Sequence, residues 1–179
     1  MKIRLSPIRA QSGLTLIELM VCCLLALLLF IGYLRVTRHY QEEMEEISVR
    51  LTISRIQVGM ALEWARRIGA GDSRQGTGEL VGANPVRWLD EPPHNYLGEL
   101  RAPKLDKLAP GRWLFDLSRK ELVYIVDNGD NLTFKNSFER VKALRWHVRL
   151  AGTEPGEKKG TEPEFGELKL MPVYEYHWF

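Results

Sequence analysis

The sequence is poor in cysteine. It has two among 179 residues, Cys22 and Cys23, and they are adjacent within an apolar stretch. Neighbouring side chains on a helix diverge by about 100°, so this pair cannot close a relaxed disulfide. A fold stapled by disulfides is therefore excluded, and we interpret both cysteines as small apolar side chains.

Patterns that carry enzymatic chemistry are also missing. The four histidines show no spacing typical of a metal-binding pair on one helix; they are His39, His94, His147 and His177. No serine, cysteine or lysine lies in a recognisable nucleophile motif, and no glycine-rich stretch has the spacing of a phosphate loop. We therefore expect that the protein is not an enzyme and uses no cofactor.

An excess of positive charge is lacking as well. The formal net charge is +2, but Lys2, Arg4 and Arg9 lie within the first 13 residues, which contain no acid. Without these three cations the net charge is 2 − 3 = −1. Because nucleic-acid binding requires a clustered basic surface, we expect no nucleic-acid partner.

The sequence does contain one long apolar run. Residues 14–34 carry a single charge, the carboxylate of Glu18, and about 20 such residues suffice to cross a membrane as a helix. The cations that precede the run keep that end cytoplasmic, which predicts a single-pass cytoplasmic (inner) membrane protein with an exported C-terminal domain. A carboxylate at the membrane centre costs on the order of 2.5–3.5 kcal/mol, and less near a helix end, so Glu18 indicates a functional partner.

The residues around this carboxylate form a motif, which reads Ser12-Gly13-Leu14-Thr15-Leu16-Ile17-Glu18-Leu19-Met20-Val21. It resembles the class III leader of type IV pilins and pseudopilins, with Leu14 in place of the usual phenylalanine. The resemblance implies cleavage between Gly13 and Leu14 by prepilin peptidase, N-methylation of Leu14, and a role for Glu18 in assembly. In that family the glutamate attracts the N-terminal amine of a neighbouring subunit. The implied partners are prepilin peptidase, other pilin or pseudopilin subunits, and an assembly platform in the inner membrane.

The alternatives for this N-terminal region are an ordinary secretory signal and an uncleaved anchor. An ordinary signal has its apolar core before the cleavage site, whereas here the apolar run follows Gly13. A simple anchor gives no reason for a carboxylate in the apolar run. The motif therefore favours a pilin-type leader.

The helix is predicted to continue well beyond the apolar run. Gly59 is the one helix breaker between Val36 and Ile68, which predicts a helix of about 50 residues. Apolar residues recur there in two sets at three- and four-residue spacing. One set is Tyr40, Met44, Ile47, Leu51, Val58, Leu62 and Ala65, and the other is Val49, Ile53, Ile56 and Met60.

Two apolar faces suggest two partners for this helix. We expect one face to pack on the protein's own sheet and the other to contact neighbouring subunits. On this hypothesis an Ile53→Glu change leaves the domain folded and blocks assembly. The alternative is a single wide stripe that faces the core.

Residues 69–111 are predicted to be a loop-rich connection. Five of the nine prolines fall in this range, which argues against regular strands. Short helical turns are expected at residues 85–89 and 105–108, because a long structureless loop is unusual in a compact domain. Trp88, Tyr96 and Leu97 are expected to anchor the segment to the core.

Parts of this segment carry a second, weaker resemblance. Its motifs are Asn84-Pro85, Trp88-Leu89, and Pro92-Pro93 followed by Asn95-Tyr96-Leu97-Gly98-Glu99. They resemble sequences of minor pilins of the mannose-sensitive haemagglutinin type. The pattern Gly-x-Trp-x-Phe-Asp followed by Leu-Val-Tyr, at residues 111–124, is similar to the start of the sheet in pseudopilins and minor pilins.

Strand-like patterns dominate from residue 112 onward. Residues 113–115 and 121–126 are predicted to form a hairpin, and residues 144–150 alternate in a way that predicts one apolar and one basic face. The basic residues of that strand are Arg145, His147 and Arg149. We expect this basic face to be solvated, with contact to an acidic surface or to a nucleic-acid backbone as the alternative. Residues 168–179 close the sheet, with Pro172 at a bulge or an edge. Three to five antiparallel strands are expected.

The stretch Asp127-Asn128-Gly129-Asp130-Asn131 has two interpretations. Its oxygen-bearing side chains offer calcium ligands, with Asp127 and Asp130 as the carboxylates. The residue types are above all those of a tight turn, and the distant glutamate of an EF-hand is absent. We therefore predict a turn and no metal, with calcium as the alternative.

Together these observations predict an α+β, pilin-like protein. Its expected regions are a cleaved leader (1–13), the transmembrane half of a long helix (14–34), its amphipathic half (35–68), a loop-rich connection (69–111) and an antiparallel sheet (112–179). The expected function is that of a minor pilin, a structural subunit of a type IV pilus-like filament in the periplasm or at the cell surface. A pseudopilin of a type II secretion system is one alternative, and a non-assembling membrane-anchored binding protein is another.

Overall fold

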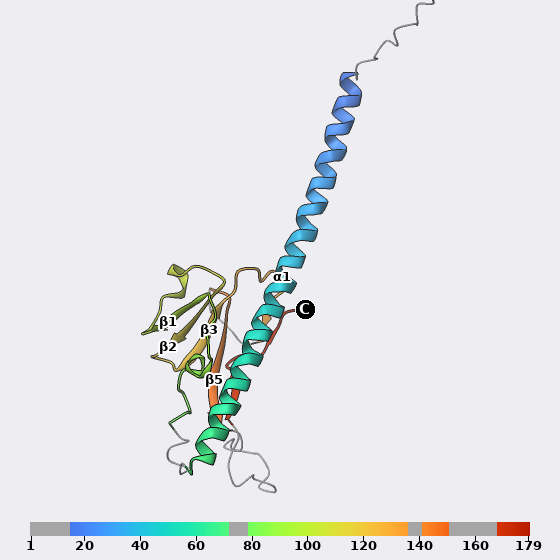
Figure 1. Cartoon of the computed structure of the whole chain (residues 1–179). Coiled ribbons are helices and arrows are strands. Elements are labelled where there is room, and N and C mark those ends of the chain that lie inside the picture. The colour runs from blue at the N-terminus through green and yellow to red at the C-terminus, as the bar shows by residue number, and fades with distance from the viewer. Residues whose placement is uncertain (1–14, 72–78, 136–140, 151–167) are drawn as a thin grey trace, which may run out of the picture. The chain divides into compact units, whose positions relative to one another are not determined.

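The computed structural model describes residues 15–71, 79–135, 141–150 and 168–179. The chain is α+β, with one long N-terminal helix and a small sheet (Figure 1). Its elements are α1 (Leu16–Gly69), the 3-10 helix η1 (Pro85–Trp88), β1 (Tyr96–Leu100), the 3-10 helix η2 (Leu105–Lys107), β2 (Arg112–Asp116), β3 (Glu121–Ile125), β4 (Thr133–Phe134), β5 (Ala143–Leu150), β6 (Leu168–Pro172) and β7 (Tyr176–His177). They divide into two compact units, Met1–Tyr40 and Gln41–Phe179, which we describe separately.

Helix α1 runs for 54 residues, as its lack of breakers predicts. It ends where the backbone of Gly71 turns left-handed, with φ of +77°, a conformation that glycine adopts without a steric penalty. Arg66 and Arg67 lie in the last turn, where cations interact favourably with the helix dipole. The predicted end of the helix is thus confirmed to within one residue.

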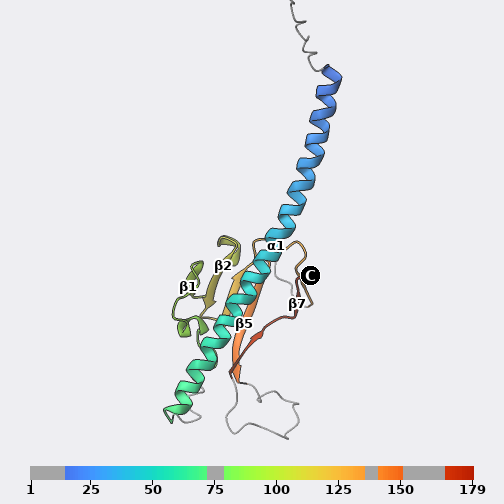
Figure 2. The ribbon, with the colours of Figure 1, turned by 45° about the vertical axis from the view of Figure 1, so that its right-hand side comes forward.

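Within the second unit, the C-terminal half of α1 packs across one face of the sheet (Figures 1 and 2). Val49, Ile56 and Met60 of α1 are buried against aromatic and aliphatic residues of the strands. The strand residues of this main core include Trp113, Phe115, Leu122, Tyr124, Leu144 and Trp146. The rings of Trp113 and Trp146 have centroids 5.5 Å apart, within the range of favourable aromatic pairs.

The main sheet has the strand order β1-β2-β3-β5-β6, and β4 and β7 form a separate two-stranded antiparallel sheet. Residues 168–179 therefore close the main sheet only through β6, and not through β7 as well. The hairpin β2–β3 is confirmed, as are the antiparallel pairs β3–β5 and β5–β6. Strand β1, however, pairs with β2 in parallel, so the sheet is mixed rather than antiparallel. Pro172 lies in the edge strand β6, as expected.

Strand β1 corrects the expectation that residues 69–111 contain no regular strand. The prolines that argued against a strand flank β1, at residues 93 and 103, and none lies within it. The two short helical turns are confirmed as η1 and η2. Trp88 and Tyr96 pack on the main core, whereas Leu97 is exposed, so its predicted anchoring role is wrong.

The opposite face of the sheet is covered as well. Leu114, Val123, Ile125 and Ala143 are buried there beneath residues that include Leu105 and Leu108 of the β1–β2 connection. This cover corrects the prediction of a solvated basic face on β5. Arg145 is only 6% exposed, and its Nη1 donates to Oε2 of Glu121 at 3.0 Å. Arg149 is exposed, as predicted.

Candidate functional site

The N-terminus of α1 is closed by a capping box. The backbone amide and the hydroxyl of Thr15 both donate to Oε2 of Glu18, at 2.8 and 2.9 Å. The Glu18 amide donates in return to the Thr15 hydroxyl oxygen at 3.3 Å. This reciprocal arrangement satisfies amides that have no partner at a helix start. Gly13 and Leu14, the predicted cleavage and methylation residues, lie outside the described residues.

Beyond this cap α1 is apolar and exposed. The helix is long and apolar enough to cross a membrane, and its most apolar window is not buried within the protein. Cys22 and Cys23 are both exposed free thiols. Membrane anchoring by this helix is thus supported at the level of length and composition.

The second half of α1 presents its two apolar sets to different surroundings. Ile56 is fully buried in the main core, whereas Leu51 and Leu62 are 56% and 67% exposed. We call Met44, Ile47, Leu51, Val58 and Leu62 the outer face of α1; all are exposed. The alternative of one wide core-facing stripe is therefore wrong for the folded chain.

Ile53 belongs to the set that packs against the main core. Ile53 is half-buried, so Ile53→Glu is expected to disturb the main core and does not isolate assembly from folding. Spacing alone separated the two apolar faces correctly but did not show which one meets the sheet.

Two glutamates of α1 are buried at the point where it enters the second unit. Glu42 is 3% exposed, and its carboxylate accepts from the backbone amide and the side-chain amide of Asn131, at 2.8 and 2.9 Å. The indole Nε1 of Trp178 donates to the same carboxylate at 3.1 Å. Glu42 thus connects α1 to the turn before β4 and to the C-terminal segment.

Glu45 lies one turn further along α1 and binds the same loop. It is 8% exposed and accepts from the backbone amides of Asp127 and Asn128 at 2.7 and 2.6 Å, and from the Tyr124 hydroxyl at 3.0 Å. Burial, and then the nearby Glu45 carboxylate, raise the pKa of Tyr124, which keeps this hydroxyl protonated as a donor. We call Glu42, Glu45 and their donors the carboxylate clamp.

Sequence reasoning did not find the carboxylate clamp. Acidic residues that follow an apolar run normally lie in solvent, and nothing local indicates that these two turn inward. The available signal was their three-residue spacing on the side of α1 that carries Val49 and Ile56, together with an asparagine-rich turn elsewhere in the chain.

The turn at residues 127–131 is confirmed, between β3 and β4. The side chains of Asp127 and Asp130 are exposed, and the side-chain amides of Asn128 and Asn131 donate to the clamp. Within the four described ranges, no group of three or more His, Cys, Asp or Glu side chains is placed to hold a metal ion. The calcium alternative therefore gains no support from the geometry.

A polar network fixes the segment that contains η1. Asn84 is buried; its Oδ1 accepts from the Val86 amide at 3.0 Å, and its Nδ2 donates to Oε1 of Glu99 at 2.8 Å. Arg87 donates to both oxygens of Glu99, at 2.7 and 2.9 Å. The Asn84 hydrogen bond and the Arg87 guanidinium hold the pKa of Glu99 below its ordinary value.

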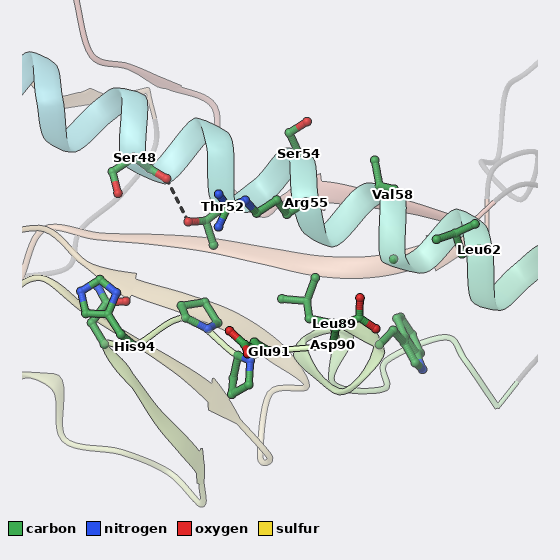
Figure 3. A pocket seen from close by; sticks show the side chains of 15 residues that line it. Ser48, Thr52, Ser54, Arg55, Val58, Leu62, Leu89, Asp90, Glu91 and His94 are labelled. Atoms are coloured by element: carbon green, nitrogen blue, oxygen red, sulfur yellow. Dashed lines mark hydrogen bonds between the residues drawn. The ribbon is translucent and has the colours of Figure 1, made fainter.

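A groove of about 790 Å³ lies between α1 and the segment after η1 (Figure 3). Helix residues from Ser48 to Leu62 form one wall, and residues from Trp88 to Asn95 form the other. Figure 3 shows Val58 and Leu62 on the helix wall and Leu89, Asp90 and Glu91 on the opposite wall. The groove thus combines part of the outer face with a rim that carries two carboxylates, and Arg55 adds one cation to the helix wall.

Comparisons with protein-family models, with curated proteins and with solved structures give no match to this chain. A function for this chain is therefore argued from its own geometry. That geometry consists of the capped apolar helix, the outer face and the groove.

Proposed function

We propose that the chain is a structural subunit, a minor pilin, of a type IV pilus-like filament. It is processed after Gly13, methylated at Leu14, held in the cytoplasmic membrane by the first half of α1, and then assembled through helix packing. Assembly of such a filament depends on van der Waals contacts and paired charges between subunits, and not on a chemical reaction with a substrate.

The observation that carries the proposal is the isolated carboxylate of Glu18. It is the one charge of residues 14–34 and the fifth residue after the predicted cleavage position. Both capping contacts use Oε2, and no hydrogen bond to Oε1 is recorded from the described part of the chain. Oε1 is therefore available to the N-terminal amine of a neighbouring subunit, a pairing that offsets the cost of burying both charges.

The outer face of α1 supports assembly by a second route. Five large apolar side chains on one helix face remain exposed in the folded chain, and such contiguous apolar surfaces mark interaction sites. Packing of this face against neighbouring helices continues, outside the membrane, the packing of the apolar first half.

The first test is the N-terminal sequence and mass of the full chain, recovered from membranes with and without co-expressed prepilin peptidase. We expect a mature chain that begins at methylated Leu14, and retention of the leader in Gly13→Ala. A wild-type chain that keeps Met1 in the presence of the peptidase contradicts the proposal and favours a simple anchor.

The capping box supplies matched variants that isolate the charge of Glu18. Glu18→Gln preserves the box, because glutamine also serves at this position, but removes the charge. Thr15→Ala removes the hydroxyl contact and leaves the charge. We expect Glu18→Gln to be cleaved and excluded from filaments, and Thr15→Ala to be cleaved and incorporated.

A pseudopilin of a type II secretion system is expected to have the same processing and the same helix packing. It differs in that its filament serves protein secretion, whereas a minor pilin belongs to a surface pilus. Deletion of the gene in its own host separates the two. Loss of surface pili with normal secretion supports the minor pilin, whereas loss of protein secretion with normal pili supports the pseudopilin.

A further inference from the structure

The groove beside α1 is lined by two carboxylates, Asp90 and Glu91, and by one guanidinium, that of Arg55 on the helix wall. Asp90 and Glu91 are exposed and line the groove. No ion pair of either carboxylate is recorded among the described residues. These two charges are therefore available to a cationic partner.

A second surface carries a cluster of exposed charge of the opposite sign. The β1–β2 connection, residues 101–111, together with the first residue of β2, contains four cations and one acid. The cations are Arg101, Lys104, Lys107 and Arg112, and all four are exposed. We call residues 101–112 the basic loop; no ion pair of these four cations is recorded within the described ranges.

The groove and the basic loop lie on opposite faces of the same sheet. The basic loop is seated on the sheet face opposite α1 through Leu105 and Leu108, which pack on Val123 and its neighbours. The groove lies on the other face, along α1. Both surfaces belong to the second compact unit, so one copy cannot place its own basic loop in its own groove.

We propose that the basic loop of one copy docks into the acidic-rimmed groove of a second copy. This inference rests on the proposed function and names a contact within the filament. Two different surfaces on opposite faces make a heterologous contact, which leaves one surface of each kind free at the ends of every chain of copies. Opposite charges at the rim fix the orientation of such a contact more than its strength.

Zero-length carbodiimide cross-linking tests the contact, because it joins a lysine amine to a carboxylate that touches it. The full chain is treated in membranes that also contain prepilin peptidase. We expect a dimer band whose digest links Lys104 or Lys107 to Asp90 or Glu91. Its yield should fall as salt rises, since exposed charge pairs are screened.

Charge reversal identifies the partner as a second copy. We expect the dimer band to be lost in the groove variant Asp90→Lys/Glu91→Lys and in the loop variant Lys104→Glu/Lys107→Glu. A chain that carries all four changes should recover the band. Glu79→Lys is the matched control, because this glutamate is exposed and outside the groove, and it should retain the band.

Two outcomes overturn the docking. One is a band that survives either pair of changes or is not recovered in the fourfold variant. The other is loss of the band through the loop changes alone, which assigns the basic loop to a different acidic surface, such as anionic lipid. The mass of the N-terminus is measured on the same samples. A wild-type chain that is processed but gives no cross-link contradicts the docking alone, whereas an unprocessed wild-type chain contradicts the proposed function.

Discussion

At the scale of single residues, Gly59 sets how closely α1 approaches η1. A Cβ atom at this position would lie 2.8 Å from the carbonyl oxygen of Trp88. That separation is too short for a carbon and an oxygen, and the atom concerned belongs to the backbone. Glycine in the middle of a long helix is therefore required by the packing of the next segment.

Gly59→Ala should lower the free energy of unfolding, although alanine is the better helix former. We expect a loss of about 1–3 kcal/mol, because the backbone at Trp88 must move. Gly69→Ala is the control, since no atom lies within 4 Å of its added Cβ, and it should be neutral within about 0.5 kcal/mol. Guanidinium unfolding of the full chain in detergent, followed by tryptophan fluorescence, measures both. Equal stability of the two variants would contradict the steric argument.

Glu99 makes the free energy of unfolding depend on pH, because its carboxylate bonds the segment around η1 to β1. Its pKa lies below the ordinary value of 4.5 in the folded chain, so the unfolded chain binds the proton more readily. The stabilisation from Glu99 is therefore present above pH 4.5 and is lost as the pH falls through the lower, folded pKa. Unfolding free energies of wild type and Glu99→Gln between pH 2 and pH 7 should converge at the acid end. Curves that stay parallel would refute this assignment.

At the scale of elements, the carboxylate clamp joins α1 to the turn between β3 and β4. Glu45 alone accepts hydrogen bonds from Tyr124, Asp127 and Asn128. Removal of a buried acceptor leaves its donors unsatisfied, and each such donor costs about 1–3 kcal/mol. The clamp is therefore a strong polar attachment of the helix to the sheet.

Glu45→Ala should destabilise the second unit by about 3 kcal/mol or more. The adjacent Glu46 pairs with the exposed Arg50, and Glu46→Ala should cost less than about 1 kcal/mol, as is usual for surface ion pairs. Chemical unfolding of the two variants compares a buried carboxylate with a surface one on the same turn. A similar small loss in both would show that the clamp contributes little.

The elements that the sequence predicted well are those set by local patterns. The length of α1, the β2–β3 hairpin and the turn at residues 127–131 follow from helix breakers, alternation and turn residues close in the chain. The parallel pairing of β1 depends on a partner that follows in the chain and is reached through η2. The burial of Arg145 depends on the cover of the sheet face opposite α1. Local patterns contain neither kind of information.

The candidate site was predictable to the same extent. Glu18 was found because a charge in an apolar run is conspicuous in sequence. The carboxylate clamp, the groove and the basic loop were not found, since each arises from segments that meet only in the fold. The direction in which α1 faces the sheet was also unpredictable, because the two apolar sets have the same spacing.

At the scale of the whole molecule, substitutions on the outer face of α1 are expected to affect assembly without affecting folding. Leu51 is 56% exposed, whereas Ile56 is fully buried. A charged side chain in place of Leu51 is hydrated in the single chain, whereas a charged side chain in place of Ile56 is buried in the main core without a partner.

Leu51→Glu should leave the free energy of unfolding within about 0.5 kcal/mol of wild type and should block entry into filaments. Ile56→Glu should instead unfold the second unit. Chemical unfolding and filament incorporation are measured on both variants. Normal incorporation of Leu51→Glu would show that the outer face has no role in assembly at this position.

The carboxylate clamp also has a consequence for how this chain can diverge. Glu42 and Glu45 bind backbone amides of the turn as well as the side chains of Asn128 and Asn131. Substitution on the helix or on the turn alone leaves buried groups without partners, so the two segments should be inherited together and change in concert. Substitutions on the outer face or at the groove rim leave no buried group of the same chain without a partner. Homologues can therefore differ at these surfaces wherever the neighbouring subunit changes with them.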